Sequence, residues 1–92
     1  MMRRAAAIAA LVSFLHAFLA VPAARATSAE DLVALGNQRY LRGEVAEARA
    51  EYEKALSARP DDPRALYNLG VLLFETGELD LALSHFERAA KA

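Results

Sequence analysis

Few side chains of this 92-residue chain could do chemistry by themselves. His85 is the only histidine after residue 26, and Glu87 lies two positions beyond it. Residues two apart on a helix do not face each other, and a catalytic or metal site needs partners that converge from other segments. We therefore interpret His85 as a surface histidine, and we expect no enzyme activity, no catalytic residue, no cofactor and no metal.

A run of carboxylates is the second candidate for chemistry. Four glutamates occupy one short stretch: Glu44, Glu47, Glu51 and Glu53. Glu47 and Glu51 would share one helix face, as an acid pair or two calcium ligands would. Calcium, however, takes several oxygens from a loop that wraps around it, whereas this stretch has the pattern of a regular helix. We interpret these carboxylates as a solvated surface.

The charge balance narrows the class of partner. The chain has 11 basic and 12 acidic side chains, and without the three arginines of residues 1–26 the balance is 8 to 12, a net charge of −4. Nucleic-acid binding would need a basic stripe, and none is present in the sequence. There is no cysteine, which excludes a disulfide and a lipoprotein anchor.

The elements that position these residues repeat along the chain. Small and apolar residues recur after about 34 residues, the period of a unit built from a helix, a turn and a second helix. The pairs are Leu32 and Leu66, Leu35 and Leu69, Gly36 and Gly70, Tyr40 and Phe74, Gly43 and Gly77, Ala48 and Ala82, Tyr52 and Phe86, and Ala55 and Ala89. Helix packing selects such residues, so the chain is predicted to be mainly a scaffold and an interaction surface.

The pattern predicts four helices over residues 29–42, 45–58, 63–76 and 79–90, with no strand. Gly43 and Gly77 fit the left-handed position that ends a helix. Asp62 before Pro63 fits an N-cap followed by a first-turn proline, and Ser28 with Asp31 fits a capping box. The predicted fold is all-α, with two stacked helix-turn-helix hairpins forming a short α-solenoid after a hydrophobic N-terminal helix. An unrelated four-helix bundle is the alternative.

Residues 29–92 resemble the tetratricopeptide repeat family. Its pattern of a large apolar residue, Leu-Gly, an aromatic, a turn glycine, Ala, an aromatic and Ala is met twice without a gap. The resemblance implies one repeat over 29–62 and a second over 63–92, which ends before its proline position. The departures are Leu32 and Leu66, where the family often has Trp, and Arg39, where an aromatic is common.

The resemblance further implies a concave groove, lined by the first helix of each repeat, that holds a peptide or helix of a partner protein. By position, its residues are Val33, Asn37, Tyr40, Tyr67, Asn68, Val71 and Phe74, with Glu30, Leu41, Arg64 and Glu75 beside them. Asn37 and Asn68 fall where some members bind a peptide carboxylate. The mixed aromatic lining better suits an apolar or helical ligand, and aromatics that only pack within their repeat are the alternative.

Residues 1–26 have the character of a leader. Arg3 and Arg4 precede an uncharged apolar run, and Ala24-Arg25-Ala26 then offers small residues to a leader peptidase. This pattern predicts a secretory signal peptide, cleaved after Ala26, with an earlier cut after Ala23 as an alternative because Val21-Pro22-Ala23 also ends in a small residue. An uncleaved anchor is the alternative, because the run is intermediate in length between a signal core and a spanning helix. We expect a bacterial protein that is periplasmic or secreted, or one anchored in the inner membrane with its repeats outside the cytoplasm.

The last predicted helix carries an apolar stripe. Leu79, Leu83 and Phe86 lie at i, i+4 and i+7, where a longer array would meet its next repeat. We expect this edge to mediate stacking through one of three arrangements: a homodimer, a partner that completes the stack, or a longer protein of which this chain is the N-terminal fragment. A membrane-anchored or self-assembling envelope component is therefore an alternative function.

Overall fold

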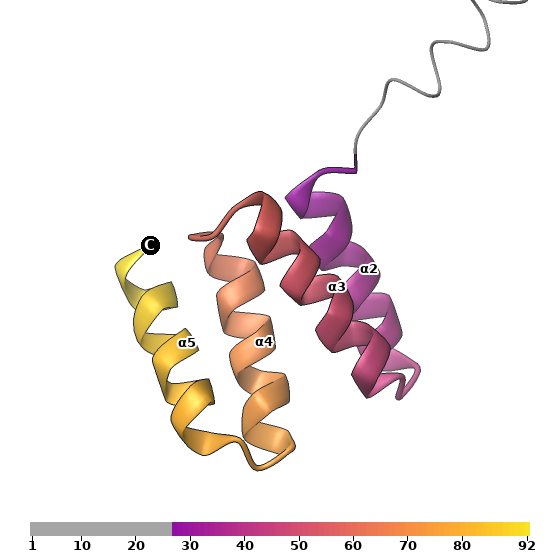
Figure 1. Ribbon diagram of the computed structural model, residues 1–92. Coiled ribbons are helices and arrows are strands. Elements are labelled where there is room, and N and C mark those ends of the chain that lie inside the picture. The colour runs from indigo at the N-terminus through magenta and orange to yellow at the C-terminus, as the bar shows by residue number, and fades with distance from the viewer. Residues whose placement is uncertain (1–26) are drawn as a thin grey trace, which may run out of the picture.

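The computed structural model describes residues 27–92, so the predicted leader and its cleavage site lie outside the described residues. Four helices follow one another: α2 (Ala29–Leu41), α3 (Val45–Ala58), α4 (Pro63–Glu75) and α5 (Leu79–Lys91). They form two antiparallel hairpins, α2 with α3 and α4 with α5, stacked through α3 and α4 (Figure 1). The predicted all-α architecture is confirmed for residues 27–92, where there is no strand.

Side-chain caps fix where the first helix of each hairpin begins. Ser28 Oγ accepts the backbone N–H of Asp31 at 3.1 Å, and the Asp31 carboxylate accepts the backbone N–H of Ser28 in return. In the second hairpin, Asp62 Oδ1 accepts the backbone N–H groups of Arg64 and Ala65 at 3.0 and 3.3 Å. Both predicted caps are confirmed, and each satisfies backbone donors that a helix start leaves unpaired.

The turns inside the hairpins depend on glycine. Gly43 has φ 77° and Gly77 has φ 86°, the left-handed region that side chains rarely adopt. Each glycine follows the first helix of its hairpin and reverses the chain within three residues, as predicted. The two helices of a hairpin are thereby brought into direct contact along their length.

In each hairpin an aromatic ring of the second helix packs against a glycine of the first. A Cβ on Gly36 would lie 2.5 Å from Tyr52 Cε1, and a Cβ on Gly70 would lie 2.7 Å from Phe86 Cε1. Tyr52 is only 2% exposed, and Ala48 is fully buried beside it. The structure therefore confirms the prediction that small residues permit the close crossing while aromatics fill the remaining space.

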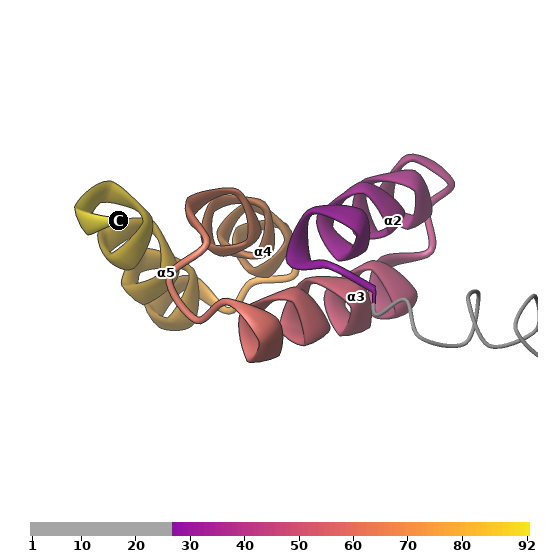
Figure 2. The ribbon, with the colours of Figure 1, turned by 90° about the horizontal axis from the view of Figure 1, so that it is seen from above.

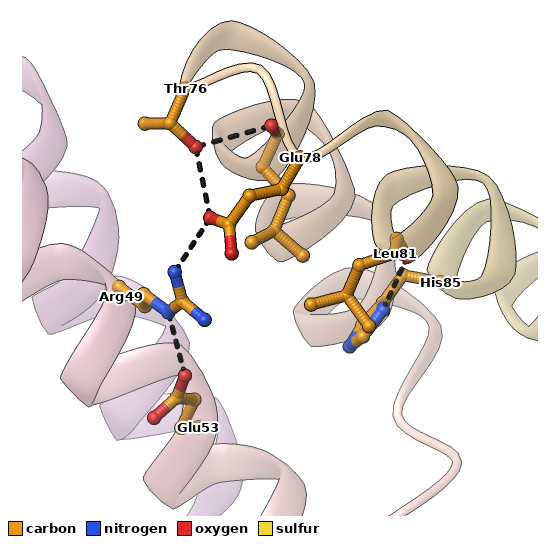
Figure 3. A network of polar contacts seen from close by, with 7 residues as sticks. Arg49, Glu53, Thr76, Glu78, Leu81 and His85 are labelled. Carbon is orange, nitrogen blue, oxygen red and sulfur yellow. Dashed lines mark hydrogen bonds and ion pairs between the residues drawn. The ribbon is translucent and has the colours of Figure 1, made fainter.

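Besides the capping residue Asp62, two polar residues that the sequence analysis placed on the surface are buried. Glu51 is 8% exposed and His85 is 9% exposed. His85 Nδ1 lies 2.8 Å from the carbonyl oxygen of Leu81, and the ring lies close to its own helix (Figure 3). Each of the two residues follows a buried alanine by three positions, so each lies on the inward face of its helix. The predictions of a surface histidine and a wholly solvated carboxylate run were wrong.

The helices of the two hairpins are arranged in two layers. In the view of Figure 2, α2 and α4 lie in the upper layer of the picture, and α3 lies in the lower layer. The face of α2 and α4 that points away from α3 is therefore free of other helices among residues 27–92. None of the helices in this part of the chain is long and apolar enough to span a membrane.

Candidate functional site

A shallow hollow runs between α2 and α4 on their free face. Its lining includes five of the seven residues predicted for the groove, together with one ring from α3; the lining residues are Asn37, Tyr40, Tyr67, Asn68, Val71 and Tyr52. A second hollow adjoins it toward the N-terminal ends of both helices, lined by Glu30, Val33, Ala34, Asn37, Pro63, Arg64, Tyr67 and Asn68. We refer to these two hollows together as the groove.

Asn37 joins the two hairpins at the floor of the groove. Its Oδ1 accepts the hydroxyl of Tyr52 at 2.6 Å and the Nδ2–H of Asn68 at 3.0 Å. These bonds link α2 to both α3 and α4, so the amide is held in one orientation. The groove floor is therefore preorganised, which lowers the entropic cost of binding a ligand.

The hydroxyl of Tyr40 donates to the carboxylate of Glu75 across the C-terminal end of the groove. This hydrogen bond, followed by burial, raises the pKa of Tyr40 above its ordinary value. Burial also raises the pKa of Tyr52. Both phenols are therefore neutral donors at physiological pH, and the contact from Tyr40 to Glu75 ties α2 to α4 at the end opposite their caps.

The wall formed by α4 is apolar and aromatic. Tyr67, Val71 and Phe74 lie at i, i+4 and i+7, and so share one face of the helix. Tyr67 is 58% exposed and Phe74 is 61% exposed. Phe74 does not line either hollow but extends the same face beyond Val71. Two exposed aromatic rings with a partly buried valine between them along one helix face are a typical contact surface for another protein.

Val33 differs from the other predicted groove residues. It reaches the second hollow, but it is only 4% exposed and packs in a buried cluster with Ala29, Ala55 and Ala65. Its side chain therefore contributes the packed base beneath the groove, and little surface that a ligand could touch.

Tyr52 is a groove residue that the sequence analysis assigned only to packing. Its ring fills the core, while its hydroxyl reaches the groove floor at Asn37. The sequence contained a signal for this hydrogen bond. Asn37 and Tyr52 of the first repeat are both polar, and the second repeat has the apolar residues Val71 and Phe86 at the equivalent positions. A tyrosine and an amide that become apolar together indicate a hydrogen bond between them.

The opposite side of the stack carries charges that hold the hairpins together. Arg49 donates to Glu53 at 2.9 Å and to Glu78 at 2.8 Å, and Thr76 Oγ1 donates to Glu78 at 3.3 Å (Figure 3). Arg49 and Glu78 belong to different hairpins, so this ion pair spans their junction. No group of three potential metal ligands occurs within residues 27–92.

The stripe predicted on the last helix is exposed at two of its three positions. Leu79 is 56% exposed and Leu83 is 57% exposed, while Phe86 is half-buried and packs at an angle against Tyr67, with 5.7 Å between the ring centroids. Leu79 and Leu83 lie on α5, away from the groove.

Comparison with protein families finds two matches. A family model described as TPR repeat matches residues 36–77, and one described as tetratricopeptide repeat matches residues 63–92. Together the matched segments run from residue 36 to residue 92, which is more than half of the chain, and they include the whole second hairpin. A comparison with curated proteins finds no match.

Proposed function

Because this chain belongs to the tetratricopeptide repeat family, which generally mediates contacts between proteins, we propose that it is an exported interaction module. It binds an apolar or helical segment of a partner protein in the groove between α2 and α4. The observation that supports the groove as the binding surface is the row of Tyr67, Val71 and Phe74, which leaves two aromatic rings largely in water. Burying such rings against a partner is a strong source of binding free energy.

The chemistry of the groove favours a helix over a charged terminus. The wall of α4 offers apolar contacts at one helical period, which matches the spacing of apolar residues along an amphipathic ligand helix. The paired amides of Asn37 and Asn68 already bond to each other, so they serve the groove floor first. Glu30 and Arg64 at the N-terminal end and Glu75 at the other end supply a polar rim that orients the ligand.

Replacing Phe74 with serine should greatly weaken capture of the partner. The full chain would be used as bait in an envelope extract, and captured proteins would be identified by mass spectrometry. A hot-spot aromatic typically accounts for about 2 kcal/mol or more, so the amount of specifically captured protein should fall by more than about tenfold.

Leu81→Ser is the matched control for this experiment, because Leu81 is also an exposed apolar residue but lies on α5, next to Arg49 and Glu53 and not on the free face of α2 and α4. Both variants should retain the helical circular dichroism of the unchanged chain. Equal loss of the partner with both variants would contradict the proposed groove.

Export is proposed from the leader pattern of residues 1–26. N-terminal sequencing of protein recovered from the cell envelope should start at Thr27, because a leader peptidase would cut after Ala24-Arg25-Ala26. A protein that remains in the membrane fraction after carbonate washing, and whose N-terminal residue is Met1, would support the alternative of an anchored envelope component. A protein that starts at Met1 in the soluble cytoplasm would contradict both.

A further inference from the structure

The outer side of the second hairpin carries an apolar hollow that adjoins the groove and shares Pro63 and Tyr67 with it. It is lined by Pro63 and Tyr67 of α4 and by Phe86, Ala89 and Ala90 of α5. Leu83 lies one helical turn before Phe86 on α5 and is largely exposed. We refer to these six residues as the trailing face. In Figure 1, α5 forms one edge of the stack, and no other described helix lies beyond it.

The first hairpin shows what covers the same surface. The residues equivalent to Pro63, Tyr67 and Ala89, one repeat earlier, are Ala29, Val33 and Ala55. All three are buried, in one cluster with Ala65 of α4. The contrast between Val33, at 4% exposed, and Tyr67, at 58%, therefore reflects the helix that covers the first position and not the second.

The covering helix has a definite pattern on the side that packs in the core. Ala65 is fully buried in the cluster with Val33, and three leucines follow it at +4, +7 and +8: Leu69, Leu72 and Leu73, all buried in the cluster that includes Ala48. A small residue at the first position lets the helix backbone approach closely, and the leucines then fill the core space next to Ala48 of α3 and Ala82 of α5. This pattern defines the kind of helix that such a surface accepts.

A second copy of the chain does not offer that pattern at its own first helix. The α2 residues equivalent to Ala65, Leu72 and Leu73 are Asp31, Gln38 and Arg39. Asp31 is exposed and engaged in the capping box, and Arg39 is paired with Glu44 at 3.0 Å. Head-to-tail stacking of two copies would bury these polar and charged groups in an apolar hollow, which is unfavourable.

The second helix of each repeat shows the opposite change: α5 is more apolar than α3 at the position that faces the next repeat. Arg49 of α3, which pairs with Glu78 of the following hairpin, is replaced on α5 by Leu83. The position that forms an ion pair at the internal junction is therefore apolar at the outer one. The two ends of the stack thus differ: the α2 end is polar, and the α5 end is apolar.

We propose that the trailing face binds an apolar helix of a partner protein that carries a small residue followed by large apolar residues at +4, +7 and +8. The helix packs on α5 as α4 packs on α3, with its small residue in the hollow between Tyr67 and Ala90. The site shares Pro63 and Tyr67 with the groove, while Leu83, Phe86, Ala89 and Ala90 belong to the trailing face alone and give the chain a second contact surface on α5.

The test uses a synthetic peptide with the sequence of residues 61–76, which carries the required pattern in Ala65, Leu69, Leu72 and Leu73. The peptide is titrated into the isotope-labelled full chain, and binding is followed by amide chemical shifts. We expect saturable shifts at Phe86, Ala89 and Ala90. The same peptide with Ala65→Asp should bind about tenfold more weakly or not at all, because the carboxylate would be buried without a partner.

A matched pair of chain variants separates this face from the rest of α5. Ala90→Glu should abolish the shifts, whereas Ser84→Glu, at an exposed position outside the hollow, should leave them unchanged. The proposal is overturned if the peptide shifts only groove residues such as Asn37 and Asn68, if the Ala65→Asp peptide binds equally well, or if no shift occurs. It is also overturned if α5 shifts change with protein concentration in the absence of peptide, because a second copy would then be the occupant.

Discussion

The variant Tyr52→Ala should lose a large part of its stability at 25 °C. Tyr52 is buried against Gly36 and also holds the groove amide of Asn37, so truncation leaves a cavity and breaks a hydrogen bond. Removing a buried aromatic typically costs about 3–5 kcal/mol. A domain of this size has roughly 3–10 kcal/mol of stability in total, so the loss is at least about a third of the whole. Urea unfolding followed by circular dichroism would measure it.

Tyr52→Phe is the matched control, since it retains the ring and removes only the hydroxyl. The expected cost is about 0.5–1.5 kcal/mol, the contribution of one hydrogen bond, and the variant should unfold cooperatively. Phe86, the equivalent residue in the second hairpin, is less buried, so Phe86→Ala should cost less than Tyr52→Ala. A Tyr52→Ala protein as stable as the unchanged chain would contradict the packing described for the first hairpin.

The second large effect is expected from overpacking at Ala48. This residue has no exposed surface and lies in the cluster that joins the two hairpins. Leucine at this position adds three carbon atoms where helices cross closely, and such changes cost about 1–3 kcal/mol. Thermal unfolding should therefore shift downward by about 4–8 °C or more, given the usual relation for small domains.

Ala46→Leu provides the control within the same helix. Ala46 is exposed, two residues before Ala48, so the same chemical change should move stability by no more than about 0.5 kcal/mol. Ala82→Leu repeats the buried substitution in the second hairpin, where Ala82 is also in the core. Equal melting temperatures for Ala48→Leu and Ala46→Leu would show that the helices do not cross at Ala48.

The fold was predictable from local signals. The two glycine turns, the caps at Ser28 and Asp62, and the repeat spacing each specify a short-range feature, and the four helices lie within about one residue of their expected ends. Short-range features of this kind depend on neighbouring residues in the sequence, so a single chain reveals them.

Burial was harder to predict, because it depends on what lies across the interface. Val33 and Tyr67 occupy the same position of the repeat, yet α4 covers the first and no described helix covers the second. The repeat pattern assigns both to the groove and cannot distinguish them. Glu51 and His85 show the reverse case: their spacing from Ala48 and Ala82 indicates an inward position, but their polar character led to a surface interpretation.

The central claim is that the free face of α2 and α4 binds another protein. Site-specific photo-crosslinking in living cells tests it most directly, with a photoreactive phenylalanine derivative placed at Phe74, which extends the free face of α4 beyond the groove, and, separately, at Glu53 on the opposite side of the stack. Our account predicts that the Phe74 position forms a covalent adduct with a distinct partner protein and that the Glu53 position does not. An adduct at Glu53 alone, the same adduct at both positions, or none at Phe74 would contradict it.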